Sequence, residues 1–201
     1  MSSSAASDVP ELKRYRLRRT EDEVTSYIGM IIFLASWAMM FAALFFSYGM
    51  VRLRAPMWPP PDLPRLPIVL PGLNTLVIGA SSAAVSLAVR ACALGRPRRA
   101  AVALAVGAAL GALFLVLQIV VWVELWREGL LPTGGPYPSV FYALTAFHAL
   151  HVLVGLAAIA VLAVRARSPH GATRNAVRLW AMFWHFVGVV WVALYVAVYL
   201  F

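Results

Sequence analysis

Long apolar runs, separated by short polar or basic segments, dominate this chain. Five of them approach or exceed the length of about 20 residues that a helix needs to cross about 30 Å of hydrocarbon. Their approximate positions are residues 28–51, 73–94, 100–123, 140–164 and 179–200. The pattern predicts an all-α integral membrane protein with five transmembrane helices.

The segments outside these runs divide the chain into a tail and a membrane domain. Residues 1–26 are polar and lack the short apolar core that marks a signal peptide. We therefore expect a polar cytoplasmic tail over residues 1–26 and a membrane domain over residues 27–201. The first connection contains several prolines, which forbid a regular helix. Trp58 and Tyr137 lie near the ends of spans, where aromatic rings anchor at the level of the lipid head groups.

Composition supports a membrane protein with little mass outside the bilayer. Hydrophobic residues make up 62% of the chain and charged residues 12%, against about 45–50% and 25% in soluble domains. The net charge of +9 would suggest nucleic acid in a soluble protein. Here the arginines lie in short loops between spans, so we expect phospholipids and no nucleic acid as partners. The single cysteine, Cys92, excludes a disulfide framework.

The basic residues are unequally divided between the two ends of the spans. Thirteen lie in the N-terminal segment and in the loops after the second and fourth spans, and four lie in the other connections. Because positive residues stay in the cytoplasm, the N-terminus is expected inside and the C-terminus outside. Four of the thirteen are close together and are candidate contacts for phospholipid head groups as well as topology determinants: Arg90, Arg96, Arg98 and Arg99.

Polar side chains inside the spans each need a reason, because burying them in lipid is costly. Only one carboxylate, Glu124, touches a span, and it lies at the rim. The lack of a carboxylate at mid-depth argues against a proton-coupled transporter. We expect the other polar residues to bond between helices or to meet lipid, and the small residues Gly107 and Gly111 to allow close helix contact. These polar residues are Ser36, Asn74, Thr75, Ser81, Ser82, Gln118, Thr145, His148, His151 and His185.

Two of the three intramembrane histidines share a span. His148 and His151 are three residues apart and are expected on one helix face, while His185 belongs to the last span. Imidazole can bind haem iron, zinc or copper. A di-iron bundle would also need carboxylates, and a two-haem carrier would need histidine pairs on two helices. Hydrogen bonding to other helices, loop backbone or lipid is therefore favoured, with a metal or haem site as the alternative.

Six motifs occur in a fixed order over residues 27–201. They read GMIIFLASWAMMFAALFFSY, WPPP, LNTLVIGASS, FLVLQIVVW, YPSVFYALTAFHALHVLVG and FWHFVGVVWVALYVAVYL. With these motifs the chain resembles subunit III of the haem–copper terminal oxidases, which includes cytochrome c oxidase subunit 3 and its quinol-oxidase counterparts. The likeness is to the short bacterial form with five helices.

The resemblance implies a fold and a set of partners. The helices would form two groups with a lipid-filled cleft between them, in the bacterial cytoplasmic membrane. The chain would carry no haem or copper, which are expected in partner subunits I and II. It would pack mainly on subunit I, with subunit II and a small subunit IV as further neighbours.

The resemblance also implies an accessory role in aerobic respiration. The complex would pass electrons from cytochrome c or quinol to oxygen and pump protons. This chain would stabilise subunit I, organise lipid near its proton-uptake side and protect it from inactivation during turnover. The resemblance implies that His148, His151 and His185 hold helices and lipid head groups, and Gln118 and Asn74 are further polar groups for helix packing.

Three positions depart from the family pattern. Trp37, Val121 and Gly188 stand where the family usually has an acidic residue. Each change removes a costly buried acid, so the fold should tolerate it. Any role of those acids in proton transfer does not carry over to this chain. A permease or an accessory subunit of a nitric oxide reductase-type complex therefore stays open as an alternative. A histidine-ligated haem electron carrier stays open as well, on the separate ground of the three intramembrane histidines.

Overall fold

The computed structural model describes residues 8–58, 60, 63–168 and 172–200, and these residues form helices and connecting loops. Five helices contain segments that are long and apolar enough to cross a membrane. This confirms the prediction of an all-α membrane protein with five spans. In chain order the helices are α1 (Asp8–Arg54), α2 (Val69–Ala93), α3 (Pro97–Arg127), α4 (Pro136–Arg165), α5 (Arg174–Leu194) and the short π-helical segment η1 (Tyr195–Leu200).

Local sequence explains where several helices begin. Pro97 and Pro136 occupy the first positions of α3 and α4, where proline loses no hydrogen bond and its fixed φ suits the helix. Gly135, just before α4, has φ of 121°, which strongly favours glycine. The hydroxyl of Thr173 caps α5 by accepting a hydrogen bond from the backbone N–H of Ala176 at 3.2 Å.

The first helix is longer than the apolar run that predicted it. We expected it to begin near residue 28, but α1 begins at Asp8 and continues through the polar segment without a break. Residues 11–26 contain no glycine or proline and several strong helix formers. Once the apolar span has formed a helix, adding further turns costs little. The boundary at residue 26 therefore marks a change of polarity and not of secondary structure.

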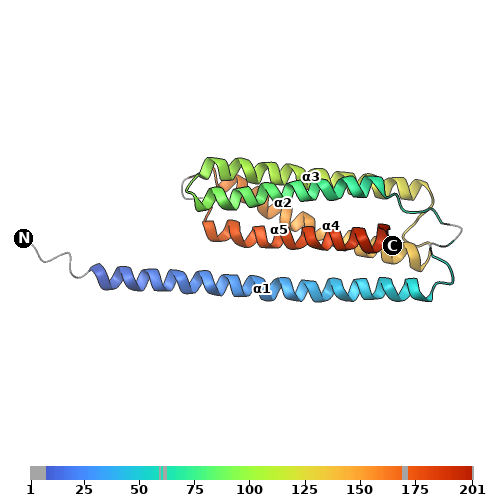
Figure 1. Ribbon diagram of the computed structural model, residues 1–201, viewed down its shortest axis with the longest axis horizontal. Helices are drawn as coiled ribbons and strands as arrows, with labels where there is room; N and C mark the ends of the chain where they lie inside the picture. Colours follow the sequence, from blue (N-terminus) through green and yellow to red (C-terminus); the bar gives the residue numbers. More distant parts are fainter. Residues whose placement is uncertain (1–7, 59, 61–62, 169–171, 201) are drawn as a thin grey trace, which may run out of the picture.

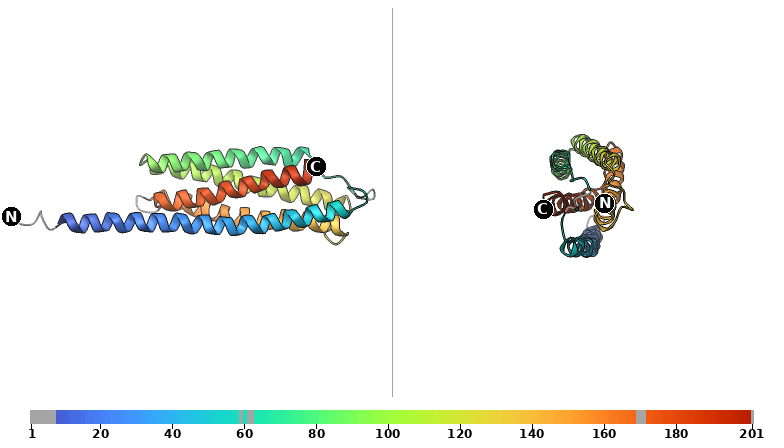
Figure 2. Two further views of the ribbon diagram at one scale, coloured as in Figure 1. Left: turned by 60° about the horizontal axis from the view of Figure 1, so that its bottom comes forward. Right: turned by 90° about the vertical axis from the view of Figure 1, so that its right-hand side faces the viewer.

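Four helices form a bundle, and the fifth lies along one side of it (Figure 1). Helix α2 packs on α3 and α5, and α4 packs on the same two helices. Helix α1 contacts α4 and α5, and the end-on view of Figure 2 shows it at the edge of the bundle. The expected lipid-filled cleft between two groups of helices stays a prediction.

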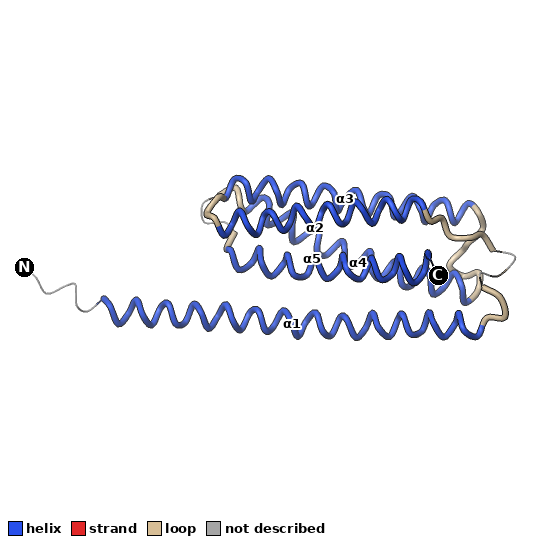
Figure 3. Tube along the Cα trace, viewed as in Figure 1, coloured by secondary structure: helices blue, strands red, loops and turns tan. Residues whose placement is uncertain are grey.

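The connecting segments gather at the two ends of the bundle (Figure 3). The α2–α3 and α4–α5 connections, both rich in arginine, lie at the end toward which the N-terminal part of α1 extends. The α1–α2 and α3–α4 connections and the C-terminus lie at the other end. The segments that the charge pattern assigned to one side of the membrane thus lie toward one end of the bundle, and the orientation itself stays a prediction.

Aromatic contacts attach α1 to the bundle at both ends. Near the arginine-rich end, the Arg178 guanidinium lies 5.0 Å from the centre of the Tyr27 ring, a favourable cation–π distance. At the other end, Trp58 contacts Tyr48 and Tyr137 edge-on, with ring centroids 5.6 and 4.7 Å apart. Trp58 and Tyr137, expected separately as anchors, therefore also hold the α1–α2 connection against α4.

Candidate functional site

The interface between α2 and α5 carries a row of polar contacts through the bundle. The two helices run antiparallel, so the beginning of α2 meets the end of α5. Each contact joins a hydroxyl group of α2 to a nitrogen-bearing ring of α5, which satisfies both groups inside the membrane. The pairs are Thr75 Oγ1 with Trp191 Nε1 at 2.9 Å, Ser81 Oγ with Trp184 Nε1 at 3.1 Å, and Ser86 Oγ with His185 Nε2 at 3.2 Å.

The Trp184 side chain joins the four helices of the bundle. Its indole N–H donates to Ser81 Oγ of α2, which in turn donates to the carbonyl oxygen of Gly107 in α3 at 2.7 Å. A Cβ atom added at Gly111 of α3 would lie 2.7 Å from Trp184 Cη2, and one at Gly155 of α4 would lie 2.9 Å from Trp184 Cε3. The indole therefore packs closely on two glycines. A Cβ added at Gly107 would lie 2.9 Å from Val85 Cγ2 of α2, so the prediction that Gly107 and Gly111 permit close packing is confirmed.

The two predicted amides are buried and each bridges two helices. Asn74 of α2 donates through Nδ2 to the carbonyl oxygen of Phe114 in α3 at 3.2 Å. Gln118 of α3 donates through Nε2 to the hydroxyl of Tyr199 in η1 at 3.5 Å, at the limit of a hydrogen bond. Because each amide joins two helices, both contacts agree with the predicted role of Asn74 and Gln118 in helix packing.

His148 lies in the centre of the bundle and is 1% exposed. Its ring centroid is 5.4 Å from that of Trp191, 6.0 Å from that of Phe114 and 6.3 Å from that of Phe41. These rings come from three different helices. Neither ring nitrogen of His148 has a hydrogen-bond partner among the described residues, so the expected hydrogen bond to another helix is not seen for this side chain. The imidazole is instead enclosed by aromatic side chains, so a planar cofactor could reach it only if the helices moved apart.

His151 lies one turn further along α4, beside α1, and is 3% exposed. Its Nδ1–H donates to the carbonyl oxygen of Phe147 at 2.6 Å. The ring of Trp37, one of the three positions where an acid was expected, meets the imidazole edge-on with centroids 3.9 Å apart. Phe41 contacts the same imidazole at 5.2 Å. Trp37 therefore covers His151 at the α1–α4 interface.

The three intramembrane histidines do not form one cluster. His185 precedes Trp191, the ring beside His148, by six residues, or about 9 Å along the helix axis. It pairs with Ser86 instead. Among the described residues, no three His, Cys, Asp or Glu side chains lie close enough together to hold a metal ion.

The other two positions of expected acids lie in the interior. Val121 is fully buried in α3. Gly188 is buried in α5, and a Cβ added there would lie 3.3 Å from Ser82 Oγ of α2. A carboxylate at either position would be removed from water at considerable cost.

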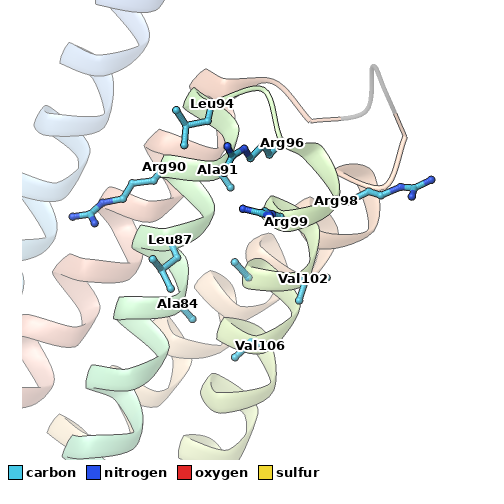
Figure 4. Close-up of a pocket in the computed structure, with 11 residues that line it drawn as sticks. Ala84, Leu87, Arg90, Ala91, Leu94, Arg96, Arg98, Arg99, Val102 and Val106 are labelled. Atoms are coloured by element: carbon cyan, nitrogen blue, oxygen red, sulfur yellow. The ribbon is translucent and has the colours of Figure 1, made fainter.

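The four candidate head-group arginines line a groove between α2 and α3 at the arginine-rich end (Figure 4). In this view Arg96 and Arg99 turn toward α2 beside Ala91, whereas Arg90 and Arg98 extend away from the groove. Arg98 also lines a second groove with Arg167. The four arginines that lie close together in the sequence therefore point in different directions in the structure.

Comparison with known proteins places these features in a family. The family model for cytochrome c oxidase subunit III matches residues 21–201. The chain belongs to this family. A cytochrome c oxidase subunit 3 from Synechocystis sp. is 34% identical over 175 residues, covering 86% of this chain and 74% of that protein. A probable cytochrome c oxidase subunit 3 from Rickettsia bellii is 32% identical over 191 residues, covering 87% and 68%, and the pig protein is 33% identical over 180 residues, covering 85% and 67%.

Membership confirms the resemblance drawn from the six motifs. The protein is a multi-pass membrane protein and a subunit III of a multi-subunit haem–copper cytochrome c oxidase, without a catalytic metal centre of its own. Nothing in these comparisons supports a nitric oxide reductase-type complex or a haem-carrying electron carrier.

Sequence reasoning missed the pairing of tryptophans with hydroxyl groups. Beside the two pairs between α2 and α5, Trp122 of α3 donates through Nε1 to Thr145 Oγ1 of α4 at 3.2 Å. A signal was available, because a buried indole N–H usually finds a partner. Trp184 and Trp191 lie well inside the last span, away from the interfacial zone where tryptophan is most common.

Proposed function

We propose that this subunit III is the non-redox accessory part of its oxidase. Haem and copper belong to subunits I and II, and the chain packs mainly on subunit I, with subunit II and a small subunit IV as further neighbours. The observation that carries this proposal is the way the polar groups of the spans are used. Hydroxyls, amides and indoles bond between helices of the same chain, and His148 is enclosed by three aromatic rings.

The outer faces of the helices support a role in organising neighbours. In the most apolar stretch of α1, only 6% of the residues are buried within the chain. Large apolar side chains such as Ile32, Met39 and Phe46 point outward. Such faces suit lipid tails and the helices of a membrane partner. We place the chain in the bacterial cytoplasmic membrane, where it stabilises subunit I and organises lipid near the proton-uptake side.

In this proposal, no buried acid of the described spans takes part in proton transfer. Trp37 is half-buried, Val121 and Gly188 are buried, none of the three is a carboxylate, and Glu124 is exposed near the end of α3. His148 and His151 are surrounded by aromatic rings. Protection of subunit I therefore comes from packing and lipid rather than from a proton relay in this chain.

A deletion strain tests this proposal. The oxidase is purified from cells that lack the chain and from cells complemented with it, and haem per subunit I, initial oxygen consumption and its decay are measured. We expect equal haem and a similar initial rate, with faster loss of activity over repeated turnovers without the chain. Loss of one haem per complex on deletion, restored by complementation, would overturn the non-redox assignment.

A further inference from the structure

The groove between α2 and α3 combines a basic head with an apolar floor. Its volume is about 690 Å³, within the range of about 300–1,000 Å³ that is typical of ligand sites. Below the arginines, its walls are aliphatic side chains from both helices, including Leu87, Val102, Ala103 and Val106. In Figure 4, Leu87, Val102 and Val106 continue along the two helices away from the arginine-rich turn.

The positive charge at the head of the groove has no local partner. Arg96 precedes Pro97 at the start of α3, and Arg99 lies in the first turn. Residues 69–123 contain no Asp or Glu. Among the described residues, no carboxylate forms an ion pair with either arginine, so the two guanidinium groups are available to an external anion.

The position of the groove identifies the class of anion. Both walls belong to spans, and Leu87, Val102 and Val106 are exposed side chains that only lipid or a membrane partner would cover. A free anion would use the arginines and leave the apolar floor empty. A phospholipid uses both, because its phosphate meets the guanidinium groups and its acyl chain covers the aliphatic walls.

We propose that the α2–α3 groove binds one anionic phospholipid, with its phosphate between Arg96 and Arg99 and an acyl chain along Leu87, Ala103 and Val106. This site lies on the α2–α3 side of the bundle, away from α1. It gives the candidate head-group arginines different roles, because Arg90 and Arg98 point away from the groove. The lipid site does not depend on which oxidase subunit the chain contacts. Bound lipid and co-purified subunits are measured separately, so either result can fail without the other.

Native mass spectrometry of the tagged full chain, purified in mild detergent with any subunits that accompany it, tests the site. The probes are phosphatidylglycerol, zwitterionic phosphatidylcholine and inorganic phosphate. The double variant Arg96→Gln with Arg99→Gln removes the head of the groove. Arg165→Gln with Arg174→Gln removes the same charge at the same end of the bundle, from residues that do not line the groove. Ala103→Leu fills the floor and leaves every charge in place, and Ala109→Leu adds the same bulk outside this groove.

We expect phosphatidylglycerol to be retained in preference to phosphatidylcholine. Its affinity should fall roughly thirtyfold in the Arg96/Arg99 variant, the effect of two basic residues at an anionic surface. It should fall several-fold in Ala103→Leu and change little in the two controls. Because Ala103→Leu changes no charge, it still tests the site if the Arg96/Arg99 variant fails to insert into the membrane.

Three results would overturn the proposal. Equal losses in both arginine pairs would indicate attraction to total charge only. Displacement by inorganic phosphate with no effect of Ala103→Leu would indicate a simple anion site. A protein subunit crosslinked to Ala103→Cys in the complex, with no lipid bound in its absence, would make the groove a subunit contact.

Discussion

The close packing of Trp184 on two glycines gives the sharpest stability prediction. Gly111→Ala would place a methyl group 2.7 Å from Trp184 Cη2 and 2.8 Å from Cζ2. Carbon atoms in contact prefer about 3.5–4.0 Å, so the indole would have to move by roughly 1 Å. The indole also packs closely on Gly155 of α4 and is fixed by its hydrogen bond to Ser81.

The size of the effect follows from two opposing contributions. Overpacking a well-filled core costs about 1–3 kcal/mol. Alanine gains up to about 1 kcal/mol over glycine in helix propensity. Gly79→Ala in α2 is the matched control, because nothing lies within 4 Å of its added Cβ. The propensity gain is common to both variants, so Gly111→Ala should be less stable than Gly79→Ala by about 1–3 kcal/mol.

The assay is thermal unfolding in mild detergent, followed by reaction of the single, half-buried thiol of Cys92 with a fluorogenic maleimide. At this chain length a difference of 1 kcal/mol shifts the unfolding temperature by about 2–4 °C. Gly111→Ala should therefore unfold several degrees below Gly79→Ala. Coincident unfolding curves would refute the claim that Trp184 is held rigidly between α3 and α4.

Two further predictions concern the polar groups. Ser81→Ala leaves the buried Trp184 N–H without its partner and should lower the free energy of unfolding by about 1–3 kcal/mol, whereas Ser36→Ala, at an exposed hydroxyl that bonds only within α1, should have little effect in the same assay. Trp37→Glu should leave the number of protons pumped per electron unchanged in reconstituted vesicles, because its neighbour His151 serves packing in this account. A changed ratio would show that this site takes part in proton transfer.

The hydropathy pattern was sufficient to predict the framework of helices, whereas the orientation predicted from the charge pattern stays a prediction. A run of about 20 apolar residues has few alternatives to a transmembrane helix, and all five predicted spans are present. The predicted start of α1 was wrong, because hydropathy marks where a helix enters the lipid and not where the helix begins. Residues 8–26 belong to the polar tail and are still helical.

The pairing of side chains between helices could not be predicted in the same way. Periodicity gives the face on which a residue lies but not the helix that this face meets. His148 and His151 were expected to share one face, yet three residues leave them about 60° apart around the axis. That angle directs His148 to the bundle centre and His151 to α1.

The arginine cluster shows the same limit. Arg98 and Arg99 are neighbours in sequence, but successive side chains of a helix differ by about 100° in direction. In the structure Arg99 turns toward α2, while Arg98 extends away from it. Proximity along the chain therefore predicted a shared location at the membrane surface but not a shared ligand.

Co-purification followed by an optical spectrum tests directly whether this chain is the non-redox accessory subunit of an oxidase. The tagged chain is isolated in mild detergent, its partners are identified by mass spectrometry, and haem is quantified against each subunit. We expect oxidase subunits I and II to accompany the chain, and the amount of haem to be proportional to the amount of subunit I. A chain that arrives alone and carries haem would contradict it, and would make His148, His151 or His185 a ligand.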